Sequence, residues 1–235
     1  SWARQIDTDH LLQASLSSVA TENVSVTFTG QIHSAYERYL DPNLNIGGRV
    51  LDTYFRNDDI RIEPHVDVKA GDEVRFTGGS ELVHTTANGN SLARGVKRKQ
   101  LGTFLVSELQ VLKTDGAVSK VTVFPALRCD AISSMAPTWS PQVGAFIAFE
   151  SFDVGRIRSI RSALRSSVSR NFRMPTFNEL YFSGGGFGNS ALRPERSTNL
   201  DIGASTRFLF AGEHSIQATY FINDMTDRIV WVPAG

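Results

Sequence analysis

Cysteine is nearly absent from this chain, and so are the long apolar runs that cross membranes as helices. The single cysteine, Cys129, excludes a disulfide framework and a CxxC metal site. No run reaches the roughly 18 apolar residues of a transmembrane helix, and the N-terminal SWARQIDTDH lacks the basic and apolar regions of a signal peptide. Neither absence excludes a membrane barrel, because barrel strands alternate apolar and polar residues and leave a weak hydropathy signal.

Net charge and catalytic motifs are lacking as well. Lys and Arg together number 24, as do Asp and Glu, so no net field points to nucleic acid. The sequence contains no GxSxG, HExxH or Walker motif, and the glycines at 184–188 are not a dinucleotide fingerprint, because Pro194 interrupts any following helix. We therefore expect no enzyme, no metal site and no cofactor. A barrel hydrolase remains an alternative, because catalytic groups on a barrel rim need no local motif.

The chain does contain a recurrent alternation of apolar and polar residues, with the period of two that is typical of β-strands. It is clearest in 24–32, 60–68, 121–129, 200–210 and 216–222. If these strands cross a bilayer, one set of side chains faces outward and the other inward. The expected outward set is Val24, Phe28, Ile62, Val66, Leu127, Ile202 and Tyr220, and the expected inward set is Arg61, Arg128, Arg161 and Arg207.

The connections between these strands have two lengths. Short turns are predicted near 21–23, 70–73, 113–117, 152–156 and 211–213, and they alternate with long segments at 33–59, 85–99, 131–141 and 170–198. Bacterial outer-membrane barrels have this asymmetry, with short periplasmic turns and long extracellular loops. A soluble sandwich also alternates, but its strands average nearer five or six residues, whereas these strands reach the roughly ten that a tilted membrane strand needs.

The predicted fold class is therefore all-β, an antiparallel transmembrane β-barrel that is only partly present. About ten strands are expected, as for a larger barrel, and residues 227–232 are read as the start of an eleventh. An open membrane sheet would leave unpaired backbone groups in lipid, so a spanning sheet must close. We interpret residues 1–235 as one barrel segment that lacks material at both ends.

The segment 170–203, RNFRMPTFNELYFSGGGFGNSALRPERSTNLDIG, is too long and too aromatic for a simple connection. Its parts FRMPTFNELY and GNSALRPERS resemble the runs FRAPTFNELY and GNPxLKPExS of TonB-dependent outer-membrane receptors, and PALRCD at 125–130 resembles their P-x-L-R-Y-D strand. The departures are Met174 for Ala, Ser190 for Pro and Cys129 for Tyr. The two loop motifs and the strand rhythm extend the similarity over nearly the whole chain.

The resemblance implies a receptor of the bacterial outer membrane with a 22-stranded barrel and an N-terminal plug. Neither plug nor TonB box is visible in this chain. Such receptors import siderophores, cobalamin, haem or sugars with energy from a TonB-type partner in the inner membrane. The expected function here is binding of a metal chelate of the siderophore type, or of cobalamin, at extracellular loops. A structural or adhesin-type outer-membrane barrel is the alternative function.

The candidate ligand-binding residues lie on the long loop: Arg173, Asn178, Tyr181, Phe187 and Asn189. Aromatic rings supply contact area, while amides and a guanidinium supply direction. The alternative is that the loop motif only fixes shape, with Phe177, Leu180 and Tyr181 packed against the barrel wall and Arg193 paired with Glu195. The glycines 184–186 and Phe187 are then the tip that moves.

Two further groups of residues have candidate roles. The run Arg94, Lys97, Arg98 and Lys99 is a candidate contact for the anionic lipopolysaccharide of the outer-membrane surface, and a solvated loop is the alternative. His33 and His84 fall at the long-loop ends of their strands, where haem capture would need them. An exposed histidine at a strand end is also common without any ligand. His65 is expected to line the lumen.

Overall fold

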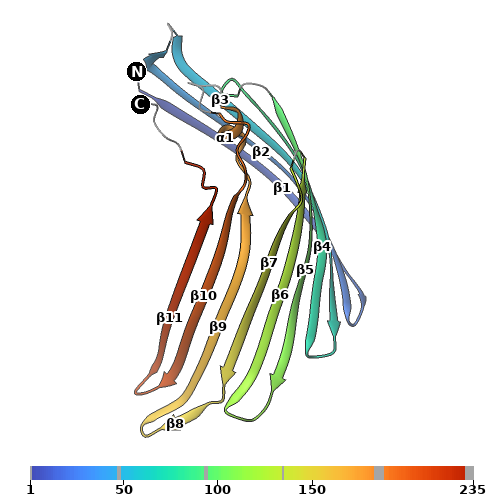
Figure 1. The fold of residues 1–235 in the computed structure, drawn as a ribbon, viewed down its shortest axis with the longest axis vertical. Coiled ribbons are helices and arrows are strands. Elements are labelled where there is room, and N and C mark those ends of the chain that lie inside the picture. The colour runs from blue at the N-terminus through green and yellow to red at the C-terminus, as the bar shows by residue number, and fades with distance from the viewer. Residues whose placement is uncertain (1, 47–48, 93–94, 134, 183–187, 231–235) are drawn as a thin grey trace.

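The computed structural model describes residues 2–46, 49–92, 95–133, 135–182 and 188–230. Figure 1 shows a single curved sheet and one short helix. The elements are β1 (Arg4–Thr21), β2 (Val24–Ile46), β3 (Arg49–Ala70), β4 (Val74–Gly89), β5 (Val96–Lys113), β6 (Val118–Ile132), β7 (Thr138–Phe149), β8 (Phe152–Val154), β9 (Ile157–Arg173), α1 (Phe177–Tyr181), β10 (Glu195–Leu209) and β11 (Glu213–Thr226).

The strands form one antiparallel meander. Their order in the sheet is β1-β2-β3-β4-β5-β6-β7-β9-β10-β11, with the short β8 paired to β9. Because each strand lies beside its neighbours in sequence, the hairpin turns alternate between the two ends of the sheet. Within the described residues β1 and β11 have one neighbour each, so the sheet is open, as predicted for part of a barrel.

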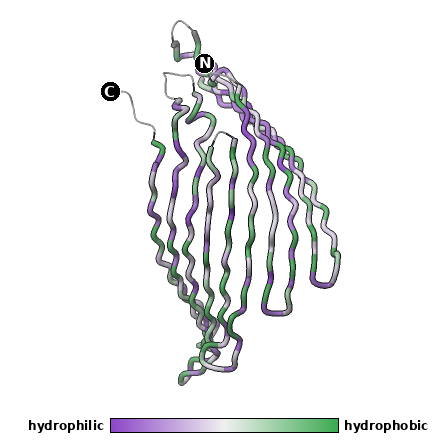
Figure 2. The backbone as a smooth tube through the Cα atoms, turned by 45° about the vertical axis from the view of Figure 1, so that its right-hand side comes forward, coloured by the Kyte–Doolittle hydropathy of each residue, from purple (hydrophilic) through white to green (hydrophobic). Residues whose placement is uncertain are grey.

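The register confirms the predicted faces of the strands. Ile62 pairs with Leu82, which pairs with Leu101 on β5; four residues further along β5, Leu105 pairs with Leu127. The same face continues through β7, β9, β10 and β11, and we call it the outward face. It carries Val24, Phe28, Ile62, Val66, Leu127, Ile202 and Tyr220, whereas Arg61, Arg128, Arg161 and Arg207 lie on the opposite face. Figure 2 shows hydrophobic and hydrophilic residues alternating along the strands.

The predicted loop at 33–59 is wrong, because most of it is strand. β2 continues to Ile46 and β3 begins at Arg49. The outward face of β2 is uninterrupted by polar residues from Val24 to Ile32, about the length that crosses a bilayer. Beyond Ile32 polar and charged residues such as Ser34 and Arg38 enter the outward face, so the regular apolar alternation ends, although Leu40 is apolar and the hydrogen-bonded ladder continues. The connections predicted at 85–99, 131–141 and 170–198 are likewise shortened to 90–95, 133–137 and 174–194.

The short turns are confirmed at the end opposite the 174–194 connection. They comprise 22–23, 71–73, 114–117 and 210–212, with β8 inside the connection from β7 to β9. Gly71 has φ +75°, a conformation that favours glycine and closes the turn from β3 to β4. The eleventh strand predicted at 227–232 is wrong within the described residues, because β11 ends at Thr226 and 227–230 are not strand. Residues 231–232 lie outside the described part.

Candidate functional site

The connection from β9 to β10 folds over the face of the sheet that carries Arg61 and Arg128. Leu92, just after β4, forms a backbone bridge with Phe182. Arg98 Nη2 on β5 donates a 2.8 Å hydrogen bond to the carbonyl oxygen of Pro175. Because β6 and β7 separate these strands from β9 in the sheet, the connection must cross the hollow of the curve. This face is therefore the concave face.

An apolar cluster holds the crossing segment in place. It consists of buried Ala87, Leu92, Val96 and Phe177, with Phe55 and Tyr181 packed against it. The guanidinium of Arg98 lies over the ring of Phe177, 4.4 Å from its centroid, in a cation–π contact. Burial against the loop lowers the pKa of Arg98. The predicted packing of Phe177 and Tyr181 against the wall is confirmed.

A capping box explains how a helix as short as α1 forms in this loop. Thr176 Oγ1 accepts a hydrogen bond from Glu179 N at 3.2 Å, and Glu179 Oε2 accepts one from Thr176 N at 2.7 Å. Two of the helix's first backbone N–H groups are thereby satisfied without a longer helix. The sequence TFNE therefore fixes the direction in which the loop leaves β9.

Arg173, the last residue of β9, is held between two carboxylates. Its Nε lies 2.5 Å from Glu195 Oε2, and its Nη2 lies 3.0 Å from Glu179 Oε1. Glu195 Oε1 also accepts a 2.7 Å hydrogen bond from Ile229 N. The expected pair of Arg193 with Glu195 is thus wrong, since Arg173 is directly opposite Glu195 in the ladder of β9 and β10. One guanidinium joins two strands and α1.

These contacts predict a pH dependence for the loop. The Arg173 guanidinium and the Ile229 N–H hold the pKa of Glu195 at about 2, below its usual 4.5, and Arg173 lowers the pKa of Glu179. A carboxyl whose pKa is lowered on folding stabilises the fold above its unfolded pKa, and this contribution is lost as the pH falls toward the folded pKa. Glu195→Gln should lower the thermal midpoint of the protein at pH 7. The difference from wild type should shrink from about pH 4.5 toward pH 2; a constant difference would contradict this.

The five predicted ligand residues have different surroundings. Arg173 is engaged by carboxylates, Tyr181 packs on the apolar cluster, and Asn189 Oδ1 accepts a 2.9 Å hydrogen bond from Ala191 N. Asn178 is exposed on α1, and its side-chain amide has no hydrogen-bond partner among the described residues. Phe187 and the glycines 184–186 lie outside the described residues.

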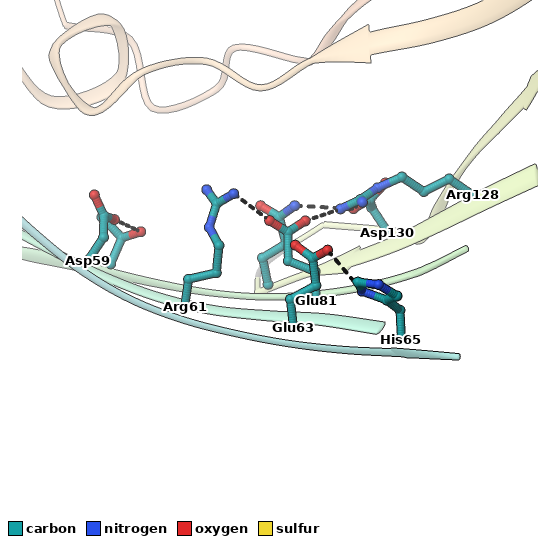
Figure 3. A network of polar contacts seen from close by, with 9 residues as sticks. Asp59, Arg61, Glu63, His65, Glu81, Arg128 and Asp130 are labelled. Carbon is teal, nitrogen blue, oxygen red and sulfur yellow. Dashed lines mark hydrogen bonds and ion pairs between the residues drawn. The ribbon is translucent and has the colours of Figure 1, made fainter. Parts of the chain in front are cut away.

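A charge network lies deeper on the concave face. Glu81 on β4 bridges Arg61, at 2.8 Å, and Arg128, at 2.5 Å, and Arg128 Nη2 also lies 2.8 Å from Asp130 Oδ1. Figure 3 shows these side chains standing on the same side of the sheet. Asp130 is 2% exposed, and Arg128 is its ion-pair partner among the described residues.

Gly102 on β5 makes this network possible. It lies between Glu81 and Asp130 in the cross-strand ladder. A Cβ at this position would meet Arg128 Nη2 at 2.2 Å and Asp130 Oδ1 at 2.9 Å. Sequence reasoning missed the network; the available signals were the inward positions of Arg128 and Asp130 and a lone glycine inside a strand, which often marks a close approach.

The histidines are placed differently from the haem-capture prediction. His33 lies within β2 on the concave face, with Nε2 3.0 Å from Asp9 Oδ1 and Nδ1 3.4 Å from Asp59 Oδ2. His84 lies on the outward face opposite Lys99, so the two histidines do not converge. His65 is on the concave face, as predicted. Among the described residues no cluster of His, Cys, Asp and Glu has the arrangement of a metal site.

The basic run near 94–99 is divided by the strand. Lys97 and Lys99 point to the outward face, whereas Arg98 points inward to the loop. Arg94 lies outside the described residues. The four predicted lipopolysaccharide contacts therefore do not share one surface.

Comparison with known structures agrees with this geometry. The chain is similar to the siderophore receptor PirA of Pseudomonas aeruginosa at 18% identity and a TM-score of 0.56, covering 93% of this chain and 46% of that one. A mutant of the ferric enterobactin receptor PfeA of the same species gives 16% identity and a TM-score of 0.59, covering 93% and 35%. The copper transporter OprC gives 10% and 0.62, covering 94% and 44%.

The chain thus spans less than half the length of these solved structures. No curated protein matches by sequence. No helix in the described part of the chain is long and apolar enough to cross a membrane. The family model for the TonB-dependent receptor-like β-barrel matches residues 2–235. The chain therefore belongs to the TonB-dependent receptor β-barrel family, whose members are transport receptors, not enzymes, in the outer membrane of Gram-negative bacteria.

Proposed function

We propose that the full-length protein binds a metal chelate of the siderophore type, or cobalamin, at its extracellular side and imports it with energy from a TonB-type transducer. The family match over residues 2–235 carries this proposal. The loop that folds over the concave face supports it, because the loop brings α1 to the hollow of the sheet, where a ligand entering from this end would meet it. The N-terminal plug and the transducer are proposed partners, and lipopolysaccharide is proposed as the surrounding lipid.

A metal chelate is the first ligand to test. The similar structures are named as a siderophore receptor, a ferric enterobactin receptor and a copper transporter. Binding of ferric enterobactin, Cu²⁺ and cyanocobalamin to the purified full-length receptor, followed by uptake in cells with and without the transducer, tests the proposal. Uptake should be lost without the transducer. Absence of transducer-dependent uptake for the whole panel, extended to haem and sugars, would refute import.

Within the loop we propose that ligand contacts come from Arg173, Asn178, Tyr181, Phe187 and Asn189, with Asn178 as the direct polar contact. Its amide is exposed and has no partner among the described residues, so it has both donors and its acceptor available.

Asn178→Ala is expected to weaken binding of the transported chelate roughly tenfold, the loss of about one hydrogen bond. Isothermal titration of the full-length receptor with the panel member that binds measures this. The matched control is Asn88→Ala, which removes an exposed amide from the outward face at the same end of the sheet. Equal affinity for wild type and Asn178→Ala would exclude Asn178 from the site.

A further inference from the structure

An open pocket of about 210 Å³ lies at the outer end of β7, β9 and β10. Trp139, Arg170, Phe172 and Arg196 line it. All four belong to the outward face: Trp139 pairs with Cys129, two residues beyond Leu127, while Phe172 pairs with Arg196, and Arg170 lies two residues beyond Val168. The two arginines and two aromatic residues therefore line the pocket from the side of the sheet away from the lumen, whereas Thr138 and Asn171, which also line it, occupy strand positions of the concave face.

The pocket lies at the level where the apolar outward band ends. Val143, Val168 and Leu200 form one cross-strand row of that band, and the rows directly beyond it contain first Arg170 and then Arg196. Trp139 is 59% exposed on this surface. Tryptophan is enriched where the apolar core of a membrane meets the polar headgroups. Because the 174–194 connection is at the same end, this boundary belongs to the extracellular leaflet.

Both arginines lack a carboxylate partner among the described residues. Neither is among the ion pairs of the described chain. The outward-facing Asp224 is separated from Arg170 by Thr198; it is a diagonal neighbour of Arg196, two residues from the ladder partner Thr226, but forms no ion pair with it. Two other outward arginines at this end are neutralised, since Arg38 pairs with Asp52 at 2.7 Å and Arg56 with Asp58 at 3.1 Å. Arg4 on β1 also faces outward without an ion pair among the described residues, but it is a single cation. Two unpaired guanidiniums beside two aromatic rings thus distinguish this pocket from the rest of the face.

We propose that this pocket binds the phosphorylated sugar headgroup of an outer-leaflet lipid, namely lipopolysaccharide. Arg170 and Arg196 bind the phosphate, since the planar guanidinium matches two phosphate oxygens at once. Trp139 and Phe172 pack against the sugar and the first acyl carbons. The proposal rests on the outer-membrane assignment and locates the lipid contact on β7, β9 and β10 instead of the basic run at 94–99.

The test is titration of the full-length receptor in detergent with purified lipid A carrying both phosphates, followed by native mass spectrometry. Wild type should retain the lipid, and the Arg170→Gln/Arg196→Gln double variant should bind it at least roughly tenfold more weakly. Lipid A without phosphates should bind the wild-type receptor as weakly as intact lipid A binds the double variant. The matched control, Arg38→Gln/Arg56→Gln, removes the same charge from the same face and should bind as wild type does.

Several results would overturn the proposal. They are absence of lipid A binding by wild type, equal affinity in the double variant, equal binding of dephosphorylated lipid A, or an equal loss in the control. If the double variant fails to fold, as judged by its thermal midpoint, the two single variants replace it. Ferric enterobactin, Cu²⁺ and cyanocobalamin binding is measured in the same preparations. Binding of these three ligands should be the same in wild type and in Arg170→Gln/Arg196→Gln. The lipid A result therefore stands whether or not the receptor proves to import a ligand.

Discussion

Replacement of Arg128 by methionine is expected to lower the free energy of unfolding of the full-length receptor by about 3 kcal/mol, because it removes one partner of a largely buried ion pair. Methionine keeps most of the volume but leaves Asp130, 2% exposed, and Glu81, 11% exposed at its side chain, with less compensation. Glu81 retains Arg61, so Asp130 bears most of the loss. Urea unfolding in lipid vesicles measures the change.

Arg161→Met is the matched control for Arg128→Met. Arg161 also lies on the concave face, but it has no carboxylate partner among the described residues, so its replacement should change the free energy of unfolding by less than about 0.5 kcal/mol. A similar loss in both variants would show that any concave arginine matters equally. A loss below about 1 kcal/mol for Arg128→Met would mean that solvent compensates the two carboxylates.

Arg173→Met is expected to release the loop, with a loss of about 2 kcal/mol. Glu195 and Glu179 would lose their shared cation, and breaking a buried pair costs about 3 to 5 kcal/mol. The smaller figure follows because Arg173 is 45% exposed at its side chain and water screens part of the interaction. Hydrogen exchange of the backbone N–H groups of Leu180 and Phe182, which close α1, measures the opening.

Arg193→Met separates this prediction from a general effect of charge. Arg193 lies in the same connection and is exposed, and it forms no ion pair within the described residues. Its replacement should leave exchange at α1 unchanged. Exchange that is equally fast in both variants would show that Arg173 has no special role in holding the loop.

The faces of the strands could be predicted from the sequence because lipid imposes a binary choice on each residue. Phe28 and Leu127 must be apolar where they meet acyl chains, while Arg61 and Arg128 must face the lumen. A slip of one residue would exchange the two sets, so the alternation specifies the register. This holds only for the part of each strand that lies in the bilayer.

The course of the strands outside the bilayer could not be predicted in the same way. Ser34, Arg38 and Asp58 are polar on the outward face, so the sequence there reads as loop. The ladder is instead continued by cross-strand pairs, such as Ser34 Oγ to Asp58 Oδ1 at 2.6 Å. The alternation of apolar and polar residues within one strand does not show which side chains pair across strands, because that depends on the register between the strands.

The sequence also predicted only part of the candidate site. The motif identified the loop and the packing of Phe177, because aromatic residues in an ordered loop need a surface to cover. It did not reveal that this surface is formed by residues of β4 and β5, including Arg98, which are distant in sequence. It also did not reveal that Glu195 pairs with Arg173 instead of Arg193. Both depend on which strand ends meet across the hollow, which is a property of the curvature of the sheet.

The long hairpin of β2 and β3 has a consequence for assembly. β2 has 23 residues, roughly 75 Å of extended chain, of which only the first part meets lipid. In the remainder Arg38 pairs with Asp52, and Tyr36 stacks with Tyr54 at 6.3 Å between ring centroids. These contacts join residues that are close in sequence, so bringing them together closes only a short loop of chain and costs little entropy. The distal half of this hairpin can therefore nucleate in water with its own register before the proximal half inserts.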